Sequence, residues 1–333
     1  MTVAAQELPE DDTLGSYLAR WLTHMRSRVR ARTWQGYECL IRCHVVPALG
    51  SRALGDLEPL DLQELYGRLL ERGLSAGTVL NLHLVLTNAF GQAVRWRLVS
   101  PNPMEGAQPP RPRRADTAAM GIEAAEQLLD ALTDSPVQLP AAIAIATGMR
   151  RGEILALRWS DVDKDFSLAQ VRRSLQSTSG QVVFEPPKTR RSRRAVVLPE
   201  FVRPYLREQL RSQSARAKEL GESWQDHDLI VDRGDGAPLN PATLSSGWGR
   251  ILRQRGLKHV RFHDLRHAHA TIMLQQGVHP KIVSERLGHA SIGITLDTYS
   301  HVMPTMQAEA VEAIDAAFAS KALEREPDAY EGT

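Results

Sequence analysis

A proline- and arginine-rich segment divides this chain of 333 residues into two parts. The Ser-Pro-Asn-Pro run at 100–103 stops any helix that precedes it, because proline lacks a backbone N–H and restricts the residue before it. Residues 109–114 then add three prolines and three arginines. At about 150 residues per domain, the length favours two domains. We therefore interpret residues 101–116 as a stiff, basic linker between them.

The residues before the linker repeat apolar side chains with the 3.6-residue period of an α-helix. Leu14, Tyr17, Leu18 and Trp21 share one face of a first helix, which Thr13 is placed to cap. Three more helices are expected at 33–46, begun by Thr33, at 60–71, between Pro59 and Gly73, and at 76–97, begun by Ser75. The pattern predicts a small four-helix domain over residues 13–100, preceded by a short acidic extension at 1–12.

The residues after the linker combine helices with a few short strands. Apolar periodicity predicts a helix at 122–132, and the run 139–146 fits a buried helix that ends at Thr147-Gly148. Branched residues predict strands only at 168–173, 181–184 and 195–198, with a turn at 178–180 between the first two. Helices dominate again from Phe201. The expected fold class is mainly α with a small antiparallel β-sheet in a second domain at 117–305, followed by a C-terminal helix and acidic tail at 306–333.

Charge is distributed along the chain in blocks that its net value of +2 conceals. Residues 13–114 carry 14 − 7 = +7 and residues 150–299 carry 25 − 16 = +9, whereas 1–12, 115–149 and 300–333 carry −4, −5 and −5. Arginine predominates among the basic residues, and its planar guanidinium binds phosphate oxygens in pairs. The pattern favours a polyanionic partner, although a GC-rich coding sequence would produce the same arginine bias.

Several function classes lack their usual sequence signals. No run of about 18 apolar residues is present to cross a bilayer, and the acidic start is the wrong flank for a signal peptide. Cys39 and Cys43, the only cysteines, are too few for a disulfide framework or a four-ligand zinc site, and a reducing cytoplasm fits. The glycines match neither nucleotide-binding fingerprint. We expect a cytoplasmic protein with no membrane partner, no metal and no cofactor.

Residues able to perform phosphate chemistry recur through the second half of the chain. Arg150 and Glu153 lie three residues apart, as do His263 and Arg266, so each pair shares a helix face. Taken alone, a helical Arg–Glu pair is typical of a protein surface, and a single histidine or tyrosine more often packs than reacts. The informative feature is the order in which the whole set occurs along the chain. The set consists of Arg150, Lys188, His263, Arg266, His289 and Tyr299.

In this order the set resembles the active-site signature of the tyrosine recombinases, or phage-type integrases. The resemblance extends through the residues that surround the set at 147–159, 263–267 and 285–299. Segments of the first half at 32–37, 47–50 and 73–75 are similar to the helical core-binding domain of integrases, so the likeness covers roughly residues 13–305. It implies a SAM-like DNA-binding domain at 13–100 joined to a tyrosine-recombinase catalytic domain.

The resemblance implies a site-specific recombinase that cleaves and rejoins DNA, without ATP or metal, to integrate or excise a mobile element. Tyr299 would be the nucleophile and form a 3′-phosphotyrosyl intermediate. Arg150 and Arg266 would clamp the non-bridging phosphate oxygens, and His289 would donate a further hydrogen bond. Such groups suit the reaction, because tyrosine attack builds negative charge on a five-coordinate phosphorus.

The remaining roles concern protons and orientation. By the same resemblance, His263 would handle the tyrosine proton, and Lys188 would protonate the leaving 5′ oxygen. The arginines beside Lys188 crowd the same turn and leave its role open. Glu153 would orient Arg150. His267 has metal-pair spacing with His263, but no third ligand is signalled, and we interpret His267 as a packing residue.

The expected partner is a double-stranded DNA attachment site bound by a homotetramer. The candidates for DNA contact are Arg28, Arg30, Arg32, Arg111, Arg113, Arg114, Arg190 and Arg191. The C-terminal helix either docks on the next protomer or folds back on its own domain. An excisionase or a DNA-bending protein is a candidate accessory partner. About 12 residues precede the first helix, too few for the separate arm-site domain of many phage integrases.

Three other functions remain open at this stage. A topoisomerase-like enzyme would use the same tyrosine chemistry on one duplex, although the compact domain at 13–100 argues against it. A DNA-binding regulator would keep the fold without catalysis, which the intact residue set disfavours. A metal-dependent phosphodiesterase would use the histidines, and its activity would be lost with a chelator.

Overall fold

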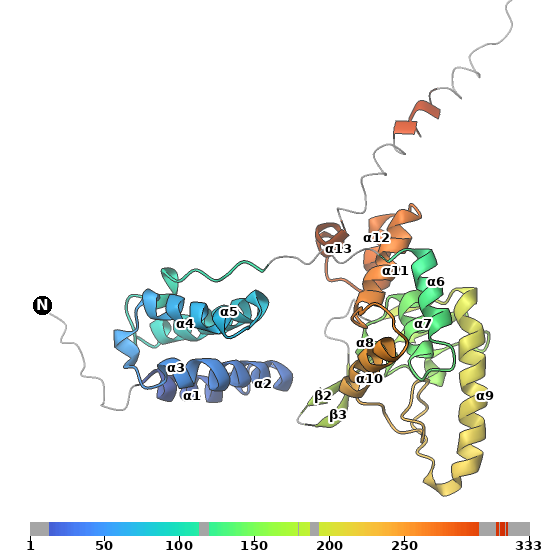
Figure 1. The fold of residues 1–333 in the computed structure, drawn as a ribbon, viewed down its shortest axis with the longest axis horizontal. Helices are drawn as coiled ribbons and strands as arrows, with labels where there is room; N and C mark the ends of the chain where they lie inside the picture. The colour runs from blue at the N-terminus through green and yellow to red at the C-terminus, as the bar shows by residue number, and fades with distance from the viewer. Residues whose placement is uncertain are drawn as a thin grey trace, which may run out of the picture. The chain divides into compact units, whose positions relative to one another are not determined.

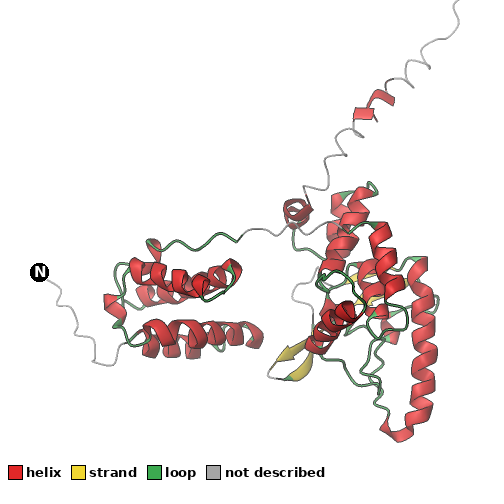
Figure 2. Cartoon of the chain, viewed as in Figure 1, coloured by secondary structure: helices red, strands yellow, loops and turns green. Residues whose placement is uncertain are grey.

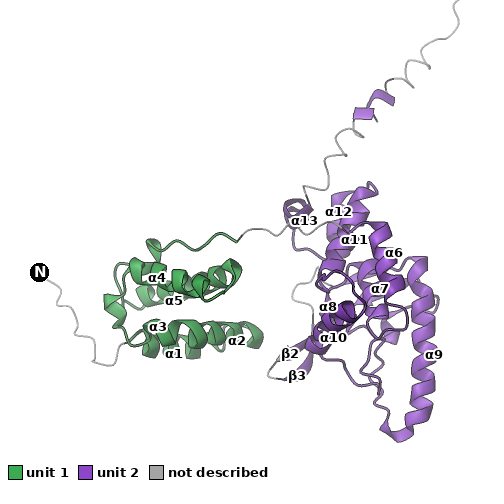
Figure 3. Cartoon of the chain, viewed as in Figure 1, with its two compact units in different colours: residues 1–116 green, residues 117–333 purple. Residues whose placement is uncertain are grey.

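The computed structural model divides the chain into two compact units, residues 1–116 and 117–333 (Figure 1, Figure 3). The structure describes residues 13–112, 120–178, 180–186, 193–299, 311–312, 314–316 and 318. Both units are built mainly from helices, and the strands of the second unit are short (Figure 2). The predicted class, mainly α with a small antiparallel β component, is confirmed. Among the described residues, no helix is both long enough and apolar enough to span a membrane.

Unit 1 is a helical bundle around a core that includes Tyr17, Trp21 and Phe90. Its helices are α1 (Leu14–Met25), α2 (Ala31–Leu40), a π-helical segment (Ile41–Val45), α3 (Val46–Leu49), α4 (Pro59–Glu71) and α5 (Ala76–Arg95). Two predicted caps are confirmed: Thr13 Oγ1 accepts from the N–H of Ser16 at 3.2 Å, and Ser75 Oγ from that of Thr78 at 3.1 Å.

The second helix of unit 1 begins earlier and extends further than predicted. It starts at Ala31 with Arg30 in the N-cap position, so Thr33 lies inside the helix and does not cap it. Trp34 Nε1 donates to the Leu22 carbonyl at 2.7 Å, which ties the first turn of α2 to α1. The helical path then widens to a π-helix ahead of Pro47, whose missing N–H removes one α-helical hydrogen bond, and it continues to Leu49.

Unit 2 packs its helices around a central apolar helix, and its described residues add four short strands. Its elements are α6 (Ile122–Ala131), α7 (Gln138–Thr147), α8 (Arg151–Ile154), β1 (Leu168–Val171), β2 (Ser174–Thr178), β3 (Gln181–Glu185), β4 (Arg194–Val197), α9 (Arg203–Leu220), α10 (Pro241–Gln254), α11 (Asp264–Gln275), α12 (Pro280–Leu287) and α13 (Ile292–Tyr299). Helix α7 packs against α11 and is buried from Pro140 to Thr147. The end of α7 therefore lies deep in unit 2, where Arg150 follows it.

The β-structure differs from the single small sheet that the sequence predicts, because the described residues form four strands in two separate pairs. β1 pairs with β4 and β2 with β3, both antiparallel, with Ala169 opposite Val196 and Leu175 opposite Phe184. Strand β2 was missed because its sequence is mostly polar and Leu175 is its one fully apolar residue. The predicted turn at 178–180 therefore connects β2 to β3, and Thr178 belongs to β2.

Gly148 is required where α7 ends and the chain turns towards Arg150. Its φ is +64°, in the left-handed region that disfavours other residues. A Cβ at this position would lie 2.5 Å from a Leu287 methyl carbon and 2.7 Å from the His269 ring. The close approach lets α11 and α12 reach the end of α7.

We predict that Gly148→Ala destabilises unit 2, because the substitution combines backbone strain with overpacking that together cost about 2–4 kcal/mol. Denaturant unfolding, with hydrogen exchange of α7 to assign the transition, measures the loss. Gly247→Ala in α10 is the matched control, since a Cβ there meets nothing within 4 Å. It should be neutral or stabilising by up to about 1 kcal/mol. Equal stability of the two variants would contradict this account.

Candidate active site

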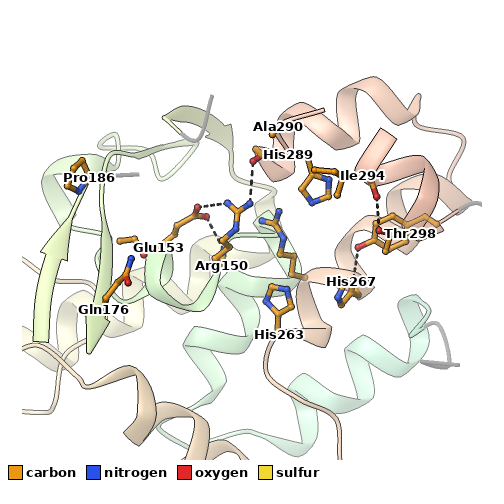
Figure 4. A pocket seen from close by; sticks show the side chains of 14 residues that line it. Arg150, Glu153, Gln176, Pro186, His263, His267, His289, Ala290, Ile294 and Thr298 are labelled. Carbon is orange, nitrogen blue, oxygen red and sulfur yellow. Dashed lines mark hydrogen bonds and ion pairs between the residues drawn. The ribbon is translucent and has the colours of Figure 1, made fainter. Parts of the chain in front are cut away.

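A cavity of about 570 Å³ in unit 2 is lined by most of the residues predicted to take part in catalysis. It lies among the start of α8, strand β2, helix α11, the turn after α12 and helix α13 (Figure 4). The predicted residues that line it are Arg150, Glu153, His263, Arg266, His289 and Tyr299. Residues more than one hundred positions apart in the sequence thus meet around one space.

Glu153 holds Arg150 at the start of α8. The Arg150 N–H donates to Glu153 Oε2 at 3.0 Å, and Arg150 Nη1 donates to Oε1 at 2.9 Å. Arg150 Nη2 also donates to the Gly288 carbonyl at 3.3 Å. Figure 4 shows the Arg150 guanidinium between Glu153 and the turn that carries His289. The three-residue spacing therefore makes an oriented pair whose carboxylate is buried, unlike an ordinary surface ion pair.

Arg194 is a second cation on the same carboxylate, and the sequence analysis gave it no role of its own. Its Nη2 donates to Glu153 Oε2 at 2.9 Å, and its Nε donates to the Arg286 carbonyl at 2.6 Å. The side chain of Arg194 is 7% exposed. Burial alone would raise the pKa of the Glu153 carboxyl, but the charges of Arg194 and Arg150 outweigh it and hold that pKa below its usual range.

Arg266 is buried at the junction of two helix ends. Its Nη1 donates to the Gly148 carbonyl at 2.6 Å and its Nη2 to the Leu287 carbonyl at 2.8 Å. Burial, followed by the charge of Arg150, lowers the pKa of Arg266 to about 9, so the guanidinium stays charged at neutral pH. Carbonyls at helix C-termini suit a cation, because they lack helical partners and carry the negative end of the helix dipole.

His289 is oriented by a residue of α13. Its Nδ1 lies 2.8 Å from the Thr295 hydroxyl, and Thr295 is 1% exposed. Burial, then the charges of Arg266 and Arg150, lower the pKa of His289 to about 4, so the ring is neutral at pH 7. The same helix that carries Tyr299 therefore also fixes the ring of His289.

Tyr299 ends α13 with its side chain only 4% exposed. Its hydroxyl oxygen lies 2.7 Å from Nδ1 of His267. Burial raises the pKa of Tyr299 to about 12, and the nearby charge of Arg266 opposes this only in part. The hydroxyl is therefore protonated at neutral pH and hydrogen-bonded to a histidine, so it needs a base before it can attack.

The interpretation of His267 as a packing residue is wrong, because its ring lines the cavity and contacts the tyrosine hydroxyl. His263, the residue expected to handle that proton, lies edge-on to His267 with ring centroids 5.2 Å apart. Burial of part of its ring, then the charges of His267 and Arg266, hold the pKa of His263 below its usual range. The signal that marked His267 was its four-residue spacing from His263, which also places it on the cavity side of α11.

The described lining has an excess of positive charge. Arg150 and Arg266 line the cavity with one carboxylate, Glu153, which is already shared with Arg194. A partly buried site with surplus arginine charge favours an anion that accepts hydrogen bonds. Within the described ranges, no three His, Cys, Asp or Glu side chains gather in a way that would hold a metal ion.

Other predicted residues lie elsewhere in the chain. Arg28, Arg30 and Arg32 are exposed at the connection between α1 and α2, and Arg111 is exposed near the end of unit 1. Five predicted residues lie outside the part of the chain that the structure describes, namely Arg113, Arg114, Lys188, Arg190 and Arg191. On either side of the lysine segment, Pro186 lines the cavity and Arg194 contacts Glu153.

The comparison with known families agrees with this geometry. Residues 120–306 match the phage integrase family, and residues 13–70 match the phage integrase N-terminal SAM-like domain. The first match alone covers more than half of the chain. A chain with these two parts is a tyrosine recombinase, an enzyme of site-specific DNA recombination. It belongs to the phage integrase family, and the resemblance found in the sequence is confirmed.

Individual relatives cover nearly the whole chain. An integrase of Saccharopolyspora erythraea is 24% identical over an aligned length of 358 positions. The alignment covers 90% of this chain and 82% of the relative. The Tn1549 transposon integrase, solved in complex with a circular intermediate DNA, has a TM-score of 0.77 and 21% identity over 90% of this chain and 100% of that one. A lambda integrase tetramer bound to a Holliday junction has a TM-score of 0.62 and 19% identity over 85% and 76%. The two solved structures have the same fold as this chain.

We predict that Glu153→Gln lowers the free energy of unfolding by about 3 kcal/mol, because it leaves the buried charge of Arg194 without its carboxylate. The depressed folded pKa of Glu153 stabilises the protein fully above its ordinary value of about 4.3, and this contribution is lost as the pH falls through the lower folded pKa. The difference in the free energy of unfolding between the wild type and the variant should therefore become smaller in acid. Urea unfolding at several pH values measures it.

The matched control is Glu208→Gln, which removes an exposed carboxylate from a pair with Arg211 on α9. It should change stability by no more than about 0.5 kcal/mol. A wild-type-like Glu153→Gln variant would show that the shared carboxylate does not stabilise the site.

Proposed function

We propose that this cavity holds the scissile phosphate of a double-stranded DNA attachment site and that the chain cleaves and reseals DNA there to integrate or excise a mobile element. The observation that carries the proposal is the meeting of two arginines, His289 and Tyr299 around one positively charged cavity. Tyrosine attack on a phosphodiester requires this combination of a nucleophile and fixed donors for the developing charge.

Arg150 and Arg266 would bind the non-bridging oxygens. A guanidinium has five N–H groups, and the contacts described above use two from the side chain of each. The remaining N–H groups would be available to a phosphate without loss of those contacts. Because the guanidinium groups are already fixed, their charge would stabilise the transition state with little reorganisation.

His289 would donate the next hydrogen bond. Its Nδ1 is held by Thr295, which leaves Nε2 for the phosphate. The arginine charges that depress its pKa would be neutralised in part by the bound phosphate. Burial, the largest cause of the shift, would still hold the pKa of His289 low, so the neutral ring would donate through Nε2.

Tyr299 would attack phosphorus and form a 3′-phosphotyrosyl intermediate with release of a 5′-hydroxyl. The intermediate conserves a phosphodiester bond, so the 5′-hydroxyl of a second DNA end can reverse the step without ATP. We assign protonation of the leaving oxygen to Lys188, with Arg190 and Arg191 in the same segment as competing donors. Pro186 beside the cavity supports this assignment, because it brings the chain to within two residues of Lys188.

We assign residues 13–100 to core DNA binding, 101–116 to the linker, 117–305 to catalysis, and 1–12 and 306–333 to the terminal segments. The exposed arginines 28, 30, 32 and 111 would contact phosphates, together with 113, 114, 190 and 191. Strand exchange requires two duplexes and thus suits a homotetramer, the assembly solved for lambda integrase. An excisionase or a DNA-bending protein would be an accessory partner, and the DNA substrate places the reaction in the cytoplasm at the nucleoid.

We predict that Tyr299→Phe abolishes the covalent adduct with a nicked half-site carrying the native attachment sequence, while duplex binding stays nearly intact. Arg150→Ala should slow adduct formation by about 100-fold or more, the scale for loss of one transition-state donor. Denaturing gels measure the adduct. Tyr205→Phe and Arg211→Ala on α9 are the matched controls, and a chelator should leave the rate unchanged. An adduct formed by Tyr299→Phe, or one lost with the chelator, would refute the proposal.

A second prediction concerns residues 306–333. If this segment docks on the next protomer, its deletion weakens synapsis of two sites more than cleavage of one half-site, because only the tetramer loses a contact. Gel-shift assays of paired complexes and adduct assays measure the two effects. Equal loss of both would instead indicate that the segment folds back on its own domain.

A further inference from the structure

His267 lies closer to the chemistry than its sequence context suggested. It is the residue after Arg266 on α11, and its Nδ1 lies 2.7 Å from the Tyr299 hydroxyl oxygen (Figure 4). The two rings are tilted by 54° with centroids 5.8 Å apart, so the contact is made through the nitrogen and not by stacking. This geometry is that of a hydrogen bond between a base and the hydroxyl that it would deprotonate.

We propose that His267 is the general base for Tyr299, a catalytic residue of the cleavage step. The inference rests on the proposed function of the cavity. As the Tyr299 oxygen forms its bond to phosphorus, its O–H bond breaks and the proton passes to the lone pair on Nδ1 of His267. The bond from phosphorus to O5′ breaks, its electrons go to O5′, and a separate donor protonates that oxygen. On resealing, the imidazolium returns its proton to Tyr299.

The surroundings of His267 keep its ring neutral and able to accept a proton. Burial lowers its pKa, and the charge of Arg266 lowers it further, whereas the carboxylate of Asp264 opposes them. Among the residues that the structure describes, the titratable and charged groups that face His267 are Arg261, His263, Asp264 and Arg266 from α11 and the segment before it, Tyr299 from α13, and His289 from the turn after α12. The one carboxylate among them, Asp264, would stabilise the imidazolium once the proton has moved.

His263 is less well placed for this role. Its ring meets the ring of His267 edge to face, whereas the Tyr299 hydroxyl is hydrogen-bonded to His267. Burial, then the neighbouring charges of His267, Arg266 and Arg150, also hold the pKa of His263 below its usual range. A donor role towards the phosphate, beside His289, is open to His263 in this arrangement.

The test isolates proton removal from Tyr299. A half-site whose scissile O5′ is replaced by sulfur needs no general acid, since a thiol is acidic enough to leave as the thiolate, with a pKa of about 8.5. The rate of adduct formation on this DNA should fall as the pH drops through the pKa of His267, which lies below the ordinary value of about 6.5. His267→Asn places an amide oxygen near the position of Nδ1, which can accept a hydrogen bond but not a proton.

We expect His267→Asn to slow the reaction by about 100-fold or more near pH 7 and to lose the titration at the pKa of His267, so that its rate rises steadily with pH as hydroxide removes the proton. A wild-type rate, or a loss that is equal at every pH, would overturn the proposal, since the latter indicates positioning alone. His263→Ala should still show the fall in rate as the pH drops through the pKa of His267. If this fall in rate disappears in His263→Ala but persists in His267→Asn, the base is His263 instead.

A measurement on the unmodified free protein gives a readout independent of activity and of any variant's folding. Long-range proton–nitrogen spectra of histidine-labelled protein should show His267 neutral at pH 7 with its proton on Nε2, because Nδ1 accepts from Tyr299. A proton on Nδ1 would overturn the inference. If the wild type forms no adduct, the proposed function itself fails, whereas a wild-type adduct with an unimpaired His267→Asn variant rejects only the role of His267.

Discussion

The site depends on buried arginine charge held by backbone carbonyls at two helix ends. Arg266 bonds the carbonyls of Gly148 and Leu287, where α7 and α12 terminate. Both helices end on a glycine in the left-handed conformation, Gly148 at φ +64° and Gly288 at φ +67°. These turns expose carbonyls that have no helical donor, and a desolvated guanidinium satisfies them. One side chain thereby ties the segment that carries Arg150 to the segment that carries His289.

Glu153 completes this arrangement by compensating two further cations. It pairs with Arg150 and Arg194, and Arg194 in turn bonds the Arg286 carbonyl just before the His289 turn. Burying so much positive charge is costly unless each group is paired, and the described lining still leaves an excess. In the function that we propose, a phosphodiester would supply the missing negative charge. The free energy cost of fixing the cations before DNA binds would then be offset in binding and in the transition state, where the phosphate charge increases.

Sequence patterns predicted much of this molecule because the relevant signals are local. Helix periodicity and the caps Thr13 and Ser75 set the starts of α1 and α5, and the order of the motif residues identified the family. Strand β2 was missed because a polar strand that pairs with a neighbour has no alternation of its own to detect. The start of α2 was misplaced because a tertiary bond from Trp34 competes with the capping preference of Thr33.

The sequence predicted which residues form the candidate site but not which of them contact one another. The family resemblance named Arg150, Arg266, His289 and Tyr299, yet no sequence rule shows that Arg194 shares Glu153. Nor could spacing show which histidine contacts Tyr299, since His263 and His267 both face the cavity from one side of α11. That choice depends on where α13 crosses α11, which is a property of the folded unit.

The most direct test is a structure of the protein on nicked DNA with vanadate bound between Tyr299 and the 5′-hydroxyl, a mimic of five-coordinate phosphorus. Our account predicts that Arg150, Arg266 and His289 contact the vanadate oxygens. It also predicts that Arg266 keeps its bonds to the carbonyls of Gly148 and Leu287, as in the free protein. An Arg266 that leaves these carbonyls, or that does not contact the vanadate, would contradict the claim that the charged site is built before DNA arrives.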